Sequence, residues 1–312
     1  MKSSVVGAIS AAAAASIWGG TYVVSKYVLA SVPSFVLLWM RYAIAAVILL
    51  VIVYAARRRS GRPLRLHLRD YALFAWVGFI GYFVSVGSQF VGTALADAHS
   101  GALITSASPA FVFLFARWLF GESLTVRRVT ALALSTIGVV VIVGWRSTHS
   151  LAFRGDMYLA IAAVTWALLS VSAKIAARKH SSLTATAYAV AFGLLFTTPV
   201  AIGQLPHLHA AVLLRPLILL GLLYLAVAST AVAFFLWNKG MELLDASSGS
   251  LFFFFQPVVG TVLGWWVLGE RLAWNTLYGS ILIFVGVWIA MNGPSATTLS
   301  PAPAGDFPGE LE

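Results

Sequence analysis

Several apolar segments of this sequence carry aromatic and neutral polar side chains at helical spacing, on faces that could bind a small molecule. One such face combines Trp18, Tyr22 and Ser25, which are spaced i, i+4 and i+7. Aromatic rings and uncharged hydrogen-bonding groups suit a zwitterion with a variable side chain better than a multivalent ion. The residues that we expect to line one cavity are Trp18, Tyr22, Tyr82, Ser85, Gln89, Trp166, Phe234, Trp237 and Gln256.

The same polar residues allow a second interpretation. Polar side chains at membrane depth usually face the interior of a helix bundle, where they meet a cavity or one another. Hydrogen bonds between helices, worth about 0.6–2 kcal/mol each, would hold them there without any ligand. Both interpretations stay open on the sequence alone.

Two prolines lie inside expected helices, Pro109 and Pro257. Each lacks a backbone N–H and frees the carbonyl four residues earlier, at Thr105 and Phe253. In lipid, a freed carbonyl must be satisfied by protein or by water in a cavity. We therefore expect a kink in each helix, either around the cavity or for packing alone.

The chain consists of two copies of one unit. Segment 95–124, LADAHSGALITSASPAFVFLFARWLFGESL, returns at 243–272 as LLDASSGSLFFFFQPVVGTVLGWWVLGERL. The offset of 148 between these segments also carries Trp18 onto Trp166 and Lys26 onto Lys174, without a gap. A constant register over so long a span is not expected by chance.

The composition indicates an all-α membrane protein. Of 312 residues, 60% are hydrophobic and 10% are charged, whereas soluble domains carry about 25% charged residues. Many apolar stretches exceed the roughly 18 residues that indicate a transmembrane helix. We expect ten such helices, at about 5–29, 33–56, 71–94, 98–119, 125–145, 155–178, 182–203, 217–240, 246–268 and 273–292.

The basic residues favour one side of the membrane. Of the 20 Lys and Arg residues, fourteen fall on the side of the N-terminus, five fall on the other side, and Arg41 lies inside the second helix. The positive-inside rule then places both termini in the cytoplasm. The net charge of +10 is explained by this topology, so we expect no nucleic-acid partner.

An odd number of helices in each copy turns the second copy upside down relative to the first. Inverted repeats of this kind are typical of secondary transporters, with a site near the membrane midplane between the repeats. We expect a first five-helix repeat at 1–148 and a second, inverted five-helix repeat at 149–293. The tail at 294–312 is rich in Pro, Ala and Ser, and is expected to be disordered in the cytoplasm.

Charged residues at the helix ends could form a gate. Lys26 and Glu270 are both expected at the outer side, and Lys174 and Glu122 at the inner side. Each lysine could therefore meet the glutamate of the other repeat, although the four could equally be unrelated end residues. The aspartates that precede two helices are expected to be N-caps, and they are Asp97 and Asp245.

These motifs resemble the drug/metabolite transporter superfamily, in its ten-helix form built from two EamA domains. The resemblance covers residues 5–292, and the aromatic content is similar to that of the YddG-type amino acid exporters. It implies export of amino acids or related metabolites across a bacterial inner membrane. The matching residues are Trp18-Gly19-Gly20, Lys26, Arg41, Ala94-Leu95, Pro109 and Gly121-Glu122-Ser123-Leu124, with the copy Gly269-Glu270-Arg271-Leu272.

We therefore expect a small-molecule transporter that exports amino acids, aromatic and other neutral ones above all, by alternating access. No carboxylate lies well inside an expected helix, and Arg41 keeps its charge, so we expect a uniporter. One alternative is a multidrug or cation efflux pump coupled to protons, which should hold an acid at the midplane. The other is an integral membrane enzyme, for which no catalytic motif is present. We expect no cofactor, metal or catalytic residue, and a monomer or weak homodimer in the lipid bilayer.

Overall fold

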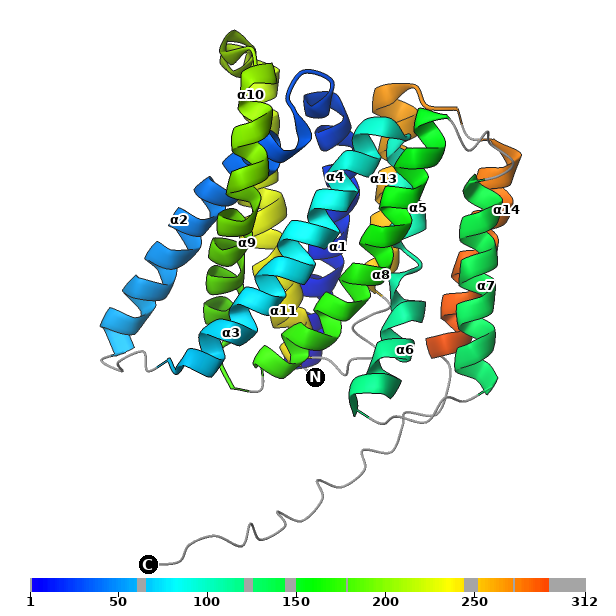
Figure 1. Ribbon diagram of the computed structural model, residues 1–312. Coiled ribbons are helices and arrows are strands. Elements are labelled where there is room, and N and C mark those ends of the chain that lie inside the picture. Colours follow the sequence, from blue (N-terminus) through cyan, green and yellow to red (C-terminus); the bar gives the residue numbers. More distant parts are fainter. Residues whose placement is uncertain are drawn as a thin grey trace, which may run out of the picture.

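All regular structure in the described part of the chain is helical, and no strand occurs there (Figure 1). The computed structural model describes residues 2–60, 66–120, 126–143, 150–177, 179–243, 252–271 and 273–291. The expectations for Glu122, Asp245, the boundary at 148 and the tail at 294–312 fall outside these ranges.

The first sequence copy and the second contribute similar sets of helices. The first contains α1 (Lys2–Leu29), α2 (Ser34–Ser60), α3 (Leu68–Val77), η1 (Gly78–Ser85), α4 (Val86–Leu95), α5 (Ala98–Thr105), α6 (Ser108–Phe120) and α7 (Val126–Val143). The second contains α8 (Leu151–Ala177), α9 (Ser182–Gln204), η2 (Leu205–His207), η3 (Ala210–Leu214), α10 (Pro216–Leu223), η4 (Tyr224–Val232), α11 (Ala233–Leu243), η5 (Phe252–Phe254), α13 (Phe255–Leu268) and α14 (Trp274–Met291).

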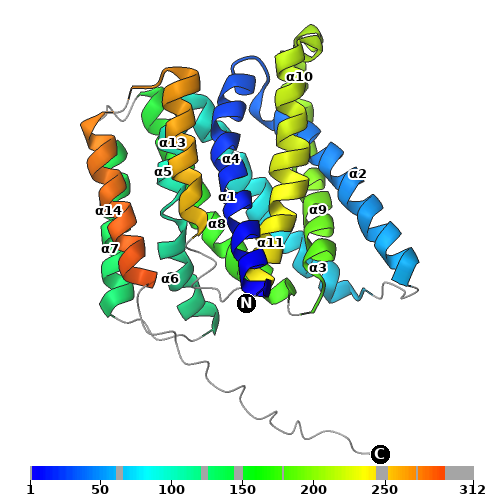
Figure 2. The same ribbon diagram turned by 180° about the vertical axis from the view of Figure 1, so that it is seen from behind.

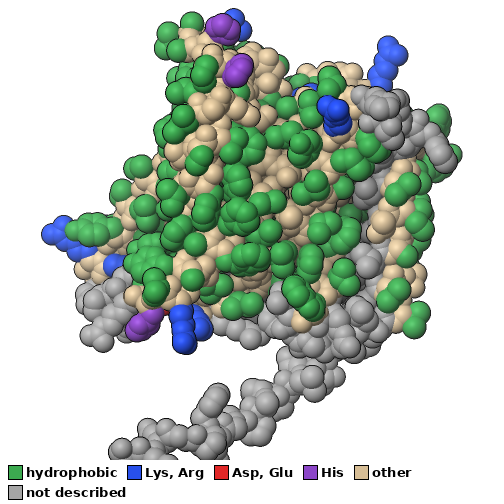
Figure 3. All heavy atoms as spheres, viewed as in Figure 1, with side chains coloured by type: hydrophobic (Ala, Val, Ile, Leu, Met, Phe, Trp, Pro, Cys, Tyr) green, Lys and Arg blue, Asp and Glu red, His purple; other side chains and the backbone are tan. Residues whose placement is uncertain are grey.

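Long apolar helices dominate the bundle. Within the described residues, six helical stretches are long and apolar enough to cross a membrane, and they are Val5–Leu29, Ser34–Arg59, Leu68–Leu95, Leu151–Ser172, Ser182–His207 and Pro216–Gly240. Two shorter apolar helices follow, Phe255–Leu268 and Trp274–Gly286. Hydrophobic side chains cover the visible flank, and the Lys and Arg side chains in view gather at the two ends (Figure 3). This distribution matches a bilayer around the flank.

The helix contacts follow the two-copy pattern of the sequence. Helix α1 packs against α11 and α13, and α8, its counterpart 148 residues later, packs against α4, α5 and α6. The second helix of each copy packs on its counterpart, as α2 on α9, and so does the last, as α7 on α14 (Figures 1 and 2). Exchanging the two copies therefore maps the contacts of α1 with α11 and α13 onto those of α8 with α4 and α6, and leaves the α2–α9 and α7–α14 contacts in place.

Glycines allow α1 and α13 to approach closely. A Cβ atom on Gly19 would lie 2.6 Å from the backbone oxygen of Gln256 and 2.7 Å from Cβ of Val259. A Cβ atom on Gly260 of α13 would lie 2.6 Å from Cβ of Ala102 in α5 and 3.4 Å from the backbone oxygen of Gly19. Small residues at such contacts are typical of helix packing in membranes.

We expect Gly19→Ala to lower stability by about 1–3 kcal/mol, because the added methyl group meets backbone atoms that cannot move aside. Gly203→Ala is the matched control, since a Cβ atom there would meet nothing within 4 Å. Thermal unfolding in detergent should show a lower midpoint for Gly19→Ala and no loss for Gly203→Ala. Equal midpoints for the two variants would show that the close contact does not exist.

The two prolines begin helices and do not lie in the middle of continuous ones. Helix α5 ends at Thr105, a turn follows at residues 106–107, and α6 starts at Ser108 with Pro109 in its first turn. The hydroxyl of Ser108 donates to the carbonyl oxygen of Thr105 at 2.6 Å, which satisfies the group that the proline leaves free. Pro257 likewise lies in the first turn of α13, directly after η5. The expected kink in the first copy is thus a break, because a serine side chain replaces the missing backbone donor.

Each copy contains a π-helical segment that the sequence periodicity did not predict. Segment η1 covers Gly78–Ser85, and η4 covers Tyr224–Val232, close to the equivalent positions of the second copy. π-helical turns inside α-helices often occur at functional sites. Both segments lie next to the central cavity described below.

Candidate functional site

A small cavity of about 30 Å³ lies at the centre of the bundle, where the two copies meet. Helices α1, α2, α4, α5, α8, α11 and α13 and segments η1 and η5 contribute to its wall. The lining residues are Trp18, Thr21, Tyr22, Arg41, Ser85, Val86, Gln89, Thr105, Ala162, Trp166, Phe234, Phe253 and Gln256.

The structure brings most of the expected cavity residues to this wall. The members of the set that line it are Trp18, Tyr22, Ser85, Gln89, Trp166, Phe234 and Gln256. Tyr82 and Trp237 lie one layer behind. The ring centre of Tyr82 is 5.0 Å from that of Phe234, and the ring centre of Trp237 is 5.4 Å from that of Trp18. The two outer rings therefore support the wall.

Aromatic rings form one side of the cavity around Trp18. The edge of Trp18 meets Trp166 at 5.4 Å and Phe234 at 5.1 Å between ring centres, and Phe253 lies 6.2 Å away. Its indole N–H donates to the backbone oxygen of Ser229 at 3.0 Å, which fixes the orientation of the ring. Edge-to-face pairs of this kind add about 0.5–1.5 kcal/mol each to the energy of burial. The cavity thus has a firm apolar wall.

Neutral hydrogen-bonding groups form another side. The hydroxyl oxygens of Tyr22 and Thr105 lie 2.6 Å apart, and both are buried. The side-chain amide of Gln256 donates to Tyr22 at 3.1 Å and to Thr105 at 3.2 Å. The cluster of Tyr22, Thr105 and Gln256 joins α1 and α5 of the first copy to α13 of the second. Separately, the hydroxyl of Ser85 in η1 donates to the backbone oxygen of Ala162 in α8 at 2.9 Å.

Arg41 lines the same cavity, although we did not predict it as a binding residue. Its equivalent in the second copy is Ala189, and a comparison of repeated positions therefore does not single it out. Its Nε donates to the hydroxyl of Thr230 at 2.5 Å, and its Nη2 donates to Ser229 at 3.3 Å. Both acceptors belong to η4. The sequence feature that could have identified Arg41 as a site residue is its charge, which lies well inside an apolar helix.

The cavity is too small for a metabolite in this state. Pockets that hold small molecules usually measure about 300–1,000 Å³. The cavity as described therefore has no room for a ligand the size of an amino acid.

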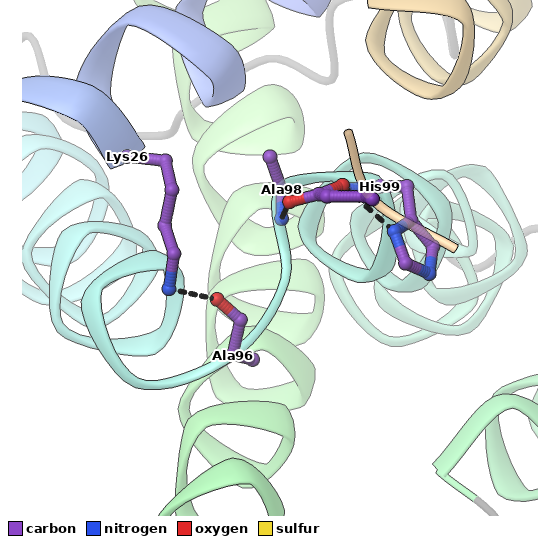
Figure 4. A network of polar contacts seen from close by, with 5 residues as sticks. Lys26, Ala96, Ala98 and His99 are labelled. Atoms are coloured by element: carbon purple, nitrogen blue, oxygen red, sulfur yellow. Dashed lines mark hydrogen bonds and ion pairs between the residues drawn. The ribbon is translucent and has the colours of Figure 1, made fainter. Parts of the chain in front are cut away.

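A network of polar contacts surrounds the turn between α4 and α5, at the end of the bundle opposite the start of α1 (Figures 1 and 4). Lys26, in the last turn of α1, donates from Nζ to the backbone oxygens of Ala94 at 3.1 Å and Ala96 at 2.5 Å. The carboxylate of Glu270 accepts from the backbone N–H groups of Ala98 at 2.7 Å and His99 at 3.0 Å. Both charged residues thus hold the turn between α4 and α5.

Glu270 provides the capping carboxylate that we expected from Asp97. Asp97 occupies the N-cap position of α5, but its side chain makes no capping hydrogen bond. Gly269, with φ of +67°, turns the chain after α13, and Glu270 then reaches α5 in the other copy. The side chain of His99 adds a contact of 2.8 Å from Nδ1 to Oε2 of Glu270.

The surroundings of Glu270 keep its carboxyl group ionised. Burial alone would raise its pKa, but the hydrogen bonds from the His99 side chain and from the backbone N–H groups of Ala98 and His99 hold the pKa below its ordinary value. A carboxylate near the positive end of a helix is also favoured by the helix dipole. Glu270 therefore carries its charge throughout the physiological pH range.

The contacts of the expected second pair, Lys174 and Glu122, fall outside what the structure describes. Glu122 lies outside the described residues, and only the helical backbone of Lys174 in α8 is described. In the first pair, Lys26 and Glu270 make their hydrogen bonds to the backbone of one shared turn.

The described residues form a bundle of apolar helices around a small central cavity lined by aromatic and polar side chains. The family model described as "EamA-like transporter family" matches residues 5–144 and again residues 153–292. The chain therefore belongs to the EamA-like transporter family, in agreement with the resemblance to the drug/metabolite transporter superfamily, and is a multi-pass membrane protein.

Several relatives in this family are named transporters or permeases. The permease-like protein YdzE of Bacillus subtilis (strain 168) is 56% identical over 69 residues, which are 22% of this chain and 88% of that protein. "Uncharacterized transporter YetK" of the same organism is 25% identical over 289 residues, 91% of this chain and 86% of that one. "Probable amino-acid metabolite efflux pump" of Escherichia coli (strain K12) is 26% identical over 289 residues, 89% of this chain and 92% of that one.

A solved structure has the same fold. A crystal structure superposes with a TM-score of 0.63 at 22% sequence identity, over 91% of this chain and 96% of the other. At that identity the likeness concerns the fold alone.

Proposed function

We propose that this protein exports amino acids, neutral and aromatic ones above all, across a bacterial inner membrane by alternating access. The observation that carries the proposal is the central cavity, whose described lining combines aromatic rings, hydroxyl groups, side-chain amides and one guanidinium group. An amino acid presents matching groups, namely a side chain of variable size, an ammonium group and a carboxylate. The relative named "Probable amino-acid metabolite efflux pump" supports the same class of substrate.

The proposed architecture is ten transmembrane helices in two inverted repeats, 1–148 and 149–293. In support, α1 and α8 run in opposite directions across the bundle, and the contacts of one copy repeat in the other (Figure 1). The start of α1 and the end of α14 lie at the same end of the bundle, where α2 also ends with Arg57, Arg58 and Arg59. The positive-inside rule makes this end cytoplasmic.

The contacts of Lys26 and Glu270 close the opposite, outer end in our proposal. Lys26 connects α1 to Ala94 and Ala96 of the same repeat, and Glu270 connects the turn after α13 to Ala98 and His99 across the interface between the repeats. Opening toward the outside would separate these elements and break charge-assisted hydrogen bonds, each worth about 1.5–3 kcal/mol. We therefore propose that Lys26 and Glu270 act as an outer gate through the backbone of this shared turn.

We further propose that transport is uniport. Proton antiport needs a group that takes up a proton near neutral pH within reach of the substrate. The described lining of the cavity contains no carboxylate, and Glu270 at the gate is held ionised by its hydrogen bonds. The substrate would then move down its own gradient, outward when the cell holds an excess.

A proton-coupled multidrug or cation pump is the main alternative. It is disfavoured by Arg41, whose positive charge in the cavity wall would repel a cationic drug. An integral membrane enzyme would need acids, bases or metal ligands positioned together, and the described residues hold no group of three or more His, Cys, Asp or Glu that could bind a metal. The relatives named above are transporters or permeases, and we propose that this chain is not an enzyme.

Transport assays in proteoliposomes test the proposal. We would measure uptake of radiolabelled phenylalanine, tryptophan, leucine, threonine, glutamate and lysine, together with a cationic dye. We expect saturable uptake of one or more neutral amino acids, and little of the dye. Transport of the dye without any of the amino acids would contradict the proposed function.

A further inference from the structure

The guanidinium group of Arg41 is deeply buried in the middle of the bundle. Only 2% of the residue is exposed, and its guanidinium carbon lies 5.1 Å from the ring centre of Phe90. Thr230 and Ser229 fix its Nε and Nη2 with neutral hydroxyl groups. Its Nη1, by contrast, has no hydrogen-bond partner among the described residues. The guanidinium group is thus fixed through Nε and Nη2, while the N–H groups of Nη1 remain available as donors.

No negative charge compensates Arg41 within the described part of the chain. The ionisable groups that act on it there are the phenols of Tyr42, Tyr82 and Tyr224, which are neutral at physiological pH. Arginine stays protonated in proteins, so the positive charge cannot be removed by loss of a proton. A buried charge without a counterion is costly, and such groups are normally paired. An anionic ligand in the cavity would supply the counterion that Arg41 lacks among the described residues.

We propose that Arg41 binds the carboxylate group of the transported substrate. This inference rests on the proposed function and narrows it to substrates that carry a carboxylate. Arg41 lines the cavity, and guanidinium donors match the two oxygens of a carboxylate in a parallel pair of hydrogen bonds. The substrate itself would then supply the missing negative charge at each turnover.

The position of Arg41 also gives the substrate one orientation. The rest of the cavity is built from two similar copies, but Arg41 has only Ala189 as its equivalent. A carboxylate held at α2 would direct the substrate side chain toward the aromatic wall of Trp18, Trp166 and Phe234. A carboxylic acid with an apolar or aromatic side chain fits this arrangement.

The first test uses the wild-type protein in detergent and needs no mutation. Binding is followed by the fluorescence of the tryptophans, two of which line the cavity. The probes are L-phenylalanine, L-leucine, their amides, which lack the carboxylate, and 3-phenylpropionate, which lacks the ammonium group. Because an amide cannot form the charge-assisted hydrogen bonds between a carboxylate and Arg41, we expect each amide to bind about 10- to 100-fold more weakly than its acid. We expect 3-phenylpropionate to retain binding.

The second test uses Arg41→Gln, which should bind acid and amide with equal, low affinity. Arg41→Lys keeps the positive charge but loses the planar guanidinium group with its paired donors, and should show an intermediate preference for the acid. Arg69→Gln, at an exposed arginine at the start of α3, is the control and should retain the wild-type preference. If Arg41→Gln does not fold, the wild-type comparison and Arg41→Lys still decide the question.

The binding results distinguish failure of this inference from failure of the proposed function. Equal binding of acids and amides to the wild-type protein would overturn the role of Arg41 while amino acid binding stands. Binding of 3-phenylpropionate that depends on Arg41, without binding of either amino acid, would support the role of Arg41 and count against amino acids as substrates. If no carboxylate probe binds, both proposals fail.

Discussion

Replacing Trp166 with alanine is expected to reduce the initial rate of the proposed amino acid transport at least tenfold, while folded protein is still recovered. Trp166 lines the cavity and contacts Trp18, Phe234 and Phe253, with ring centres 5.4, 5.8 and 6.2 Å away. Truncation removes part of the wall that would hold the substrate side chain. The measurement is uptake into proteoliposomes at matched protein content. A single symmetric peak in size-exclusion chromatography, at the wild-type elution volume, is the check on folding.

Trp265→Ala is the matched control for this prediction. Trp265 is 60% exposed on α13 and lies outside the cavity lining, so its loss should leave transport near the wild-type rate. Gln256→Ala should behave like Trp166→Ala, because it removes a lining amide while Tyr22 and Thr105 keep their mutual hydrogen bond. Wild-type transport by both cavity variants would show that the substrate binds elsewhere.

Glu270→Gln is expected to open the outer end of the protein more often, by about tenfold or more. The change removes the charge that accepts hydrogen bonds from the start of α5 and from His99, and each such bond is worth about 1.5–3 kcal/mol. The chain has no cysteine, so Ser85→Cys supplies a single reporter in the cavity wall. Labelling of this cysteine from the outside by a membrane-impermeant maleimide should be slow in the parent and faster with Glu270→Gln.

The neighbouring exposed residue provides the control for the gate. Arg271→Gln changes a charge by the same amount and should leave labelling unchanged. The pH dependence has a definite sign: a carboxyl group with a lowered pKa stabilises the closed state above its ordinary pKa, and that contribution is lost as pH falls through the lowered value. The rate of parent labelling, divided at each pH by that of the same protein unfolded in detergent to correct for the thiolate fraction, should therefore be constant between about pH 6 and pH 8. A higher normalised rate at pH 6 would contradict the assignment of Glu270.

Repetition and helical spacing in the sequence were enough to predict much of the cavity wall. Trp18 and Trp166 occupy equivalent positions, and Ser85 and Gln89 share one helical face with Tyr82. Because a polar stripe on an otherwise apolar helix must face the bundle interior, the structure brings these residues together. The depth of a side chain is harder to predict, and Tyr82 and Trp237 consequently lie one layer behind the wall.

Other parts of the site depend on tertiary contacts that leave no periodic signal. Arg41 was passed over because it is not repeated, and its partners Ser229 and Thr230 lie in a π-helical segment that apolar periodicity does not reveal. The cap on α5 comes from Glu270, which is 172 residues away from Ala98 in the sequence. Asp97, the local candidate, was favoured because capping rules consider only neighbouring residues. Contacts between the two copies decide both features.

Net flux in proteoliposomes, with and without an imposed pH gradient, tests most directly the claim that this protein is an amino acid uniporter. Vesicles would be loaded with a transported neutral amino acid, and efflux and counterflow would be followed at equal pH and across one pH unit. We predict counterflow, the same initial efflux in both conditions, and no accumulation beyond equilibrium. Accumulation of the amino acid against its gradient, driven by protons alone, would contradict this prediction.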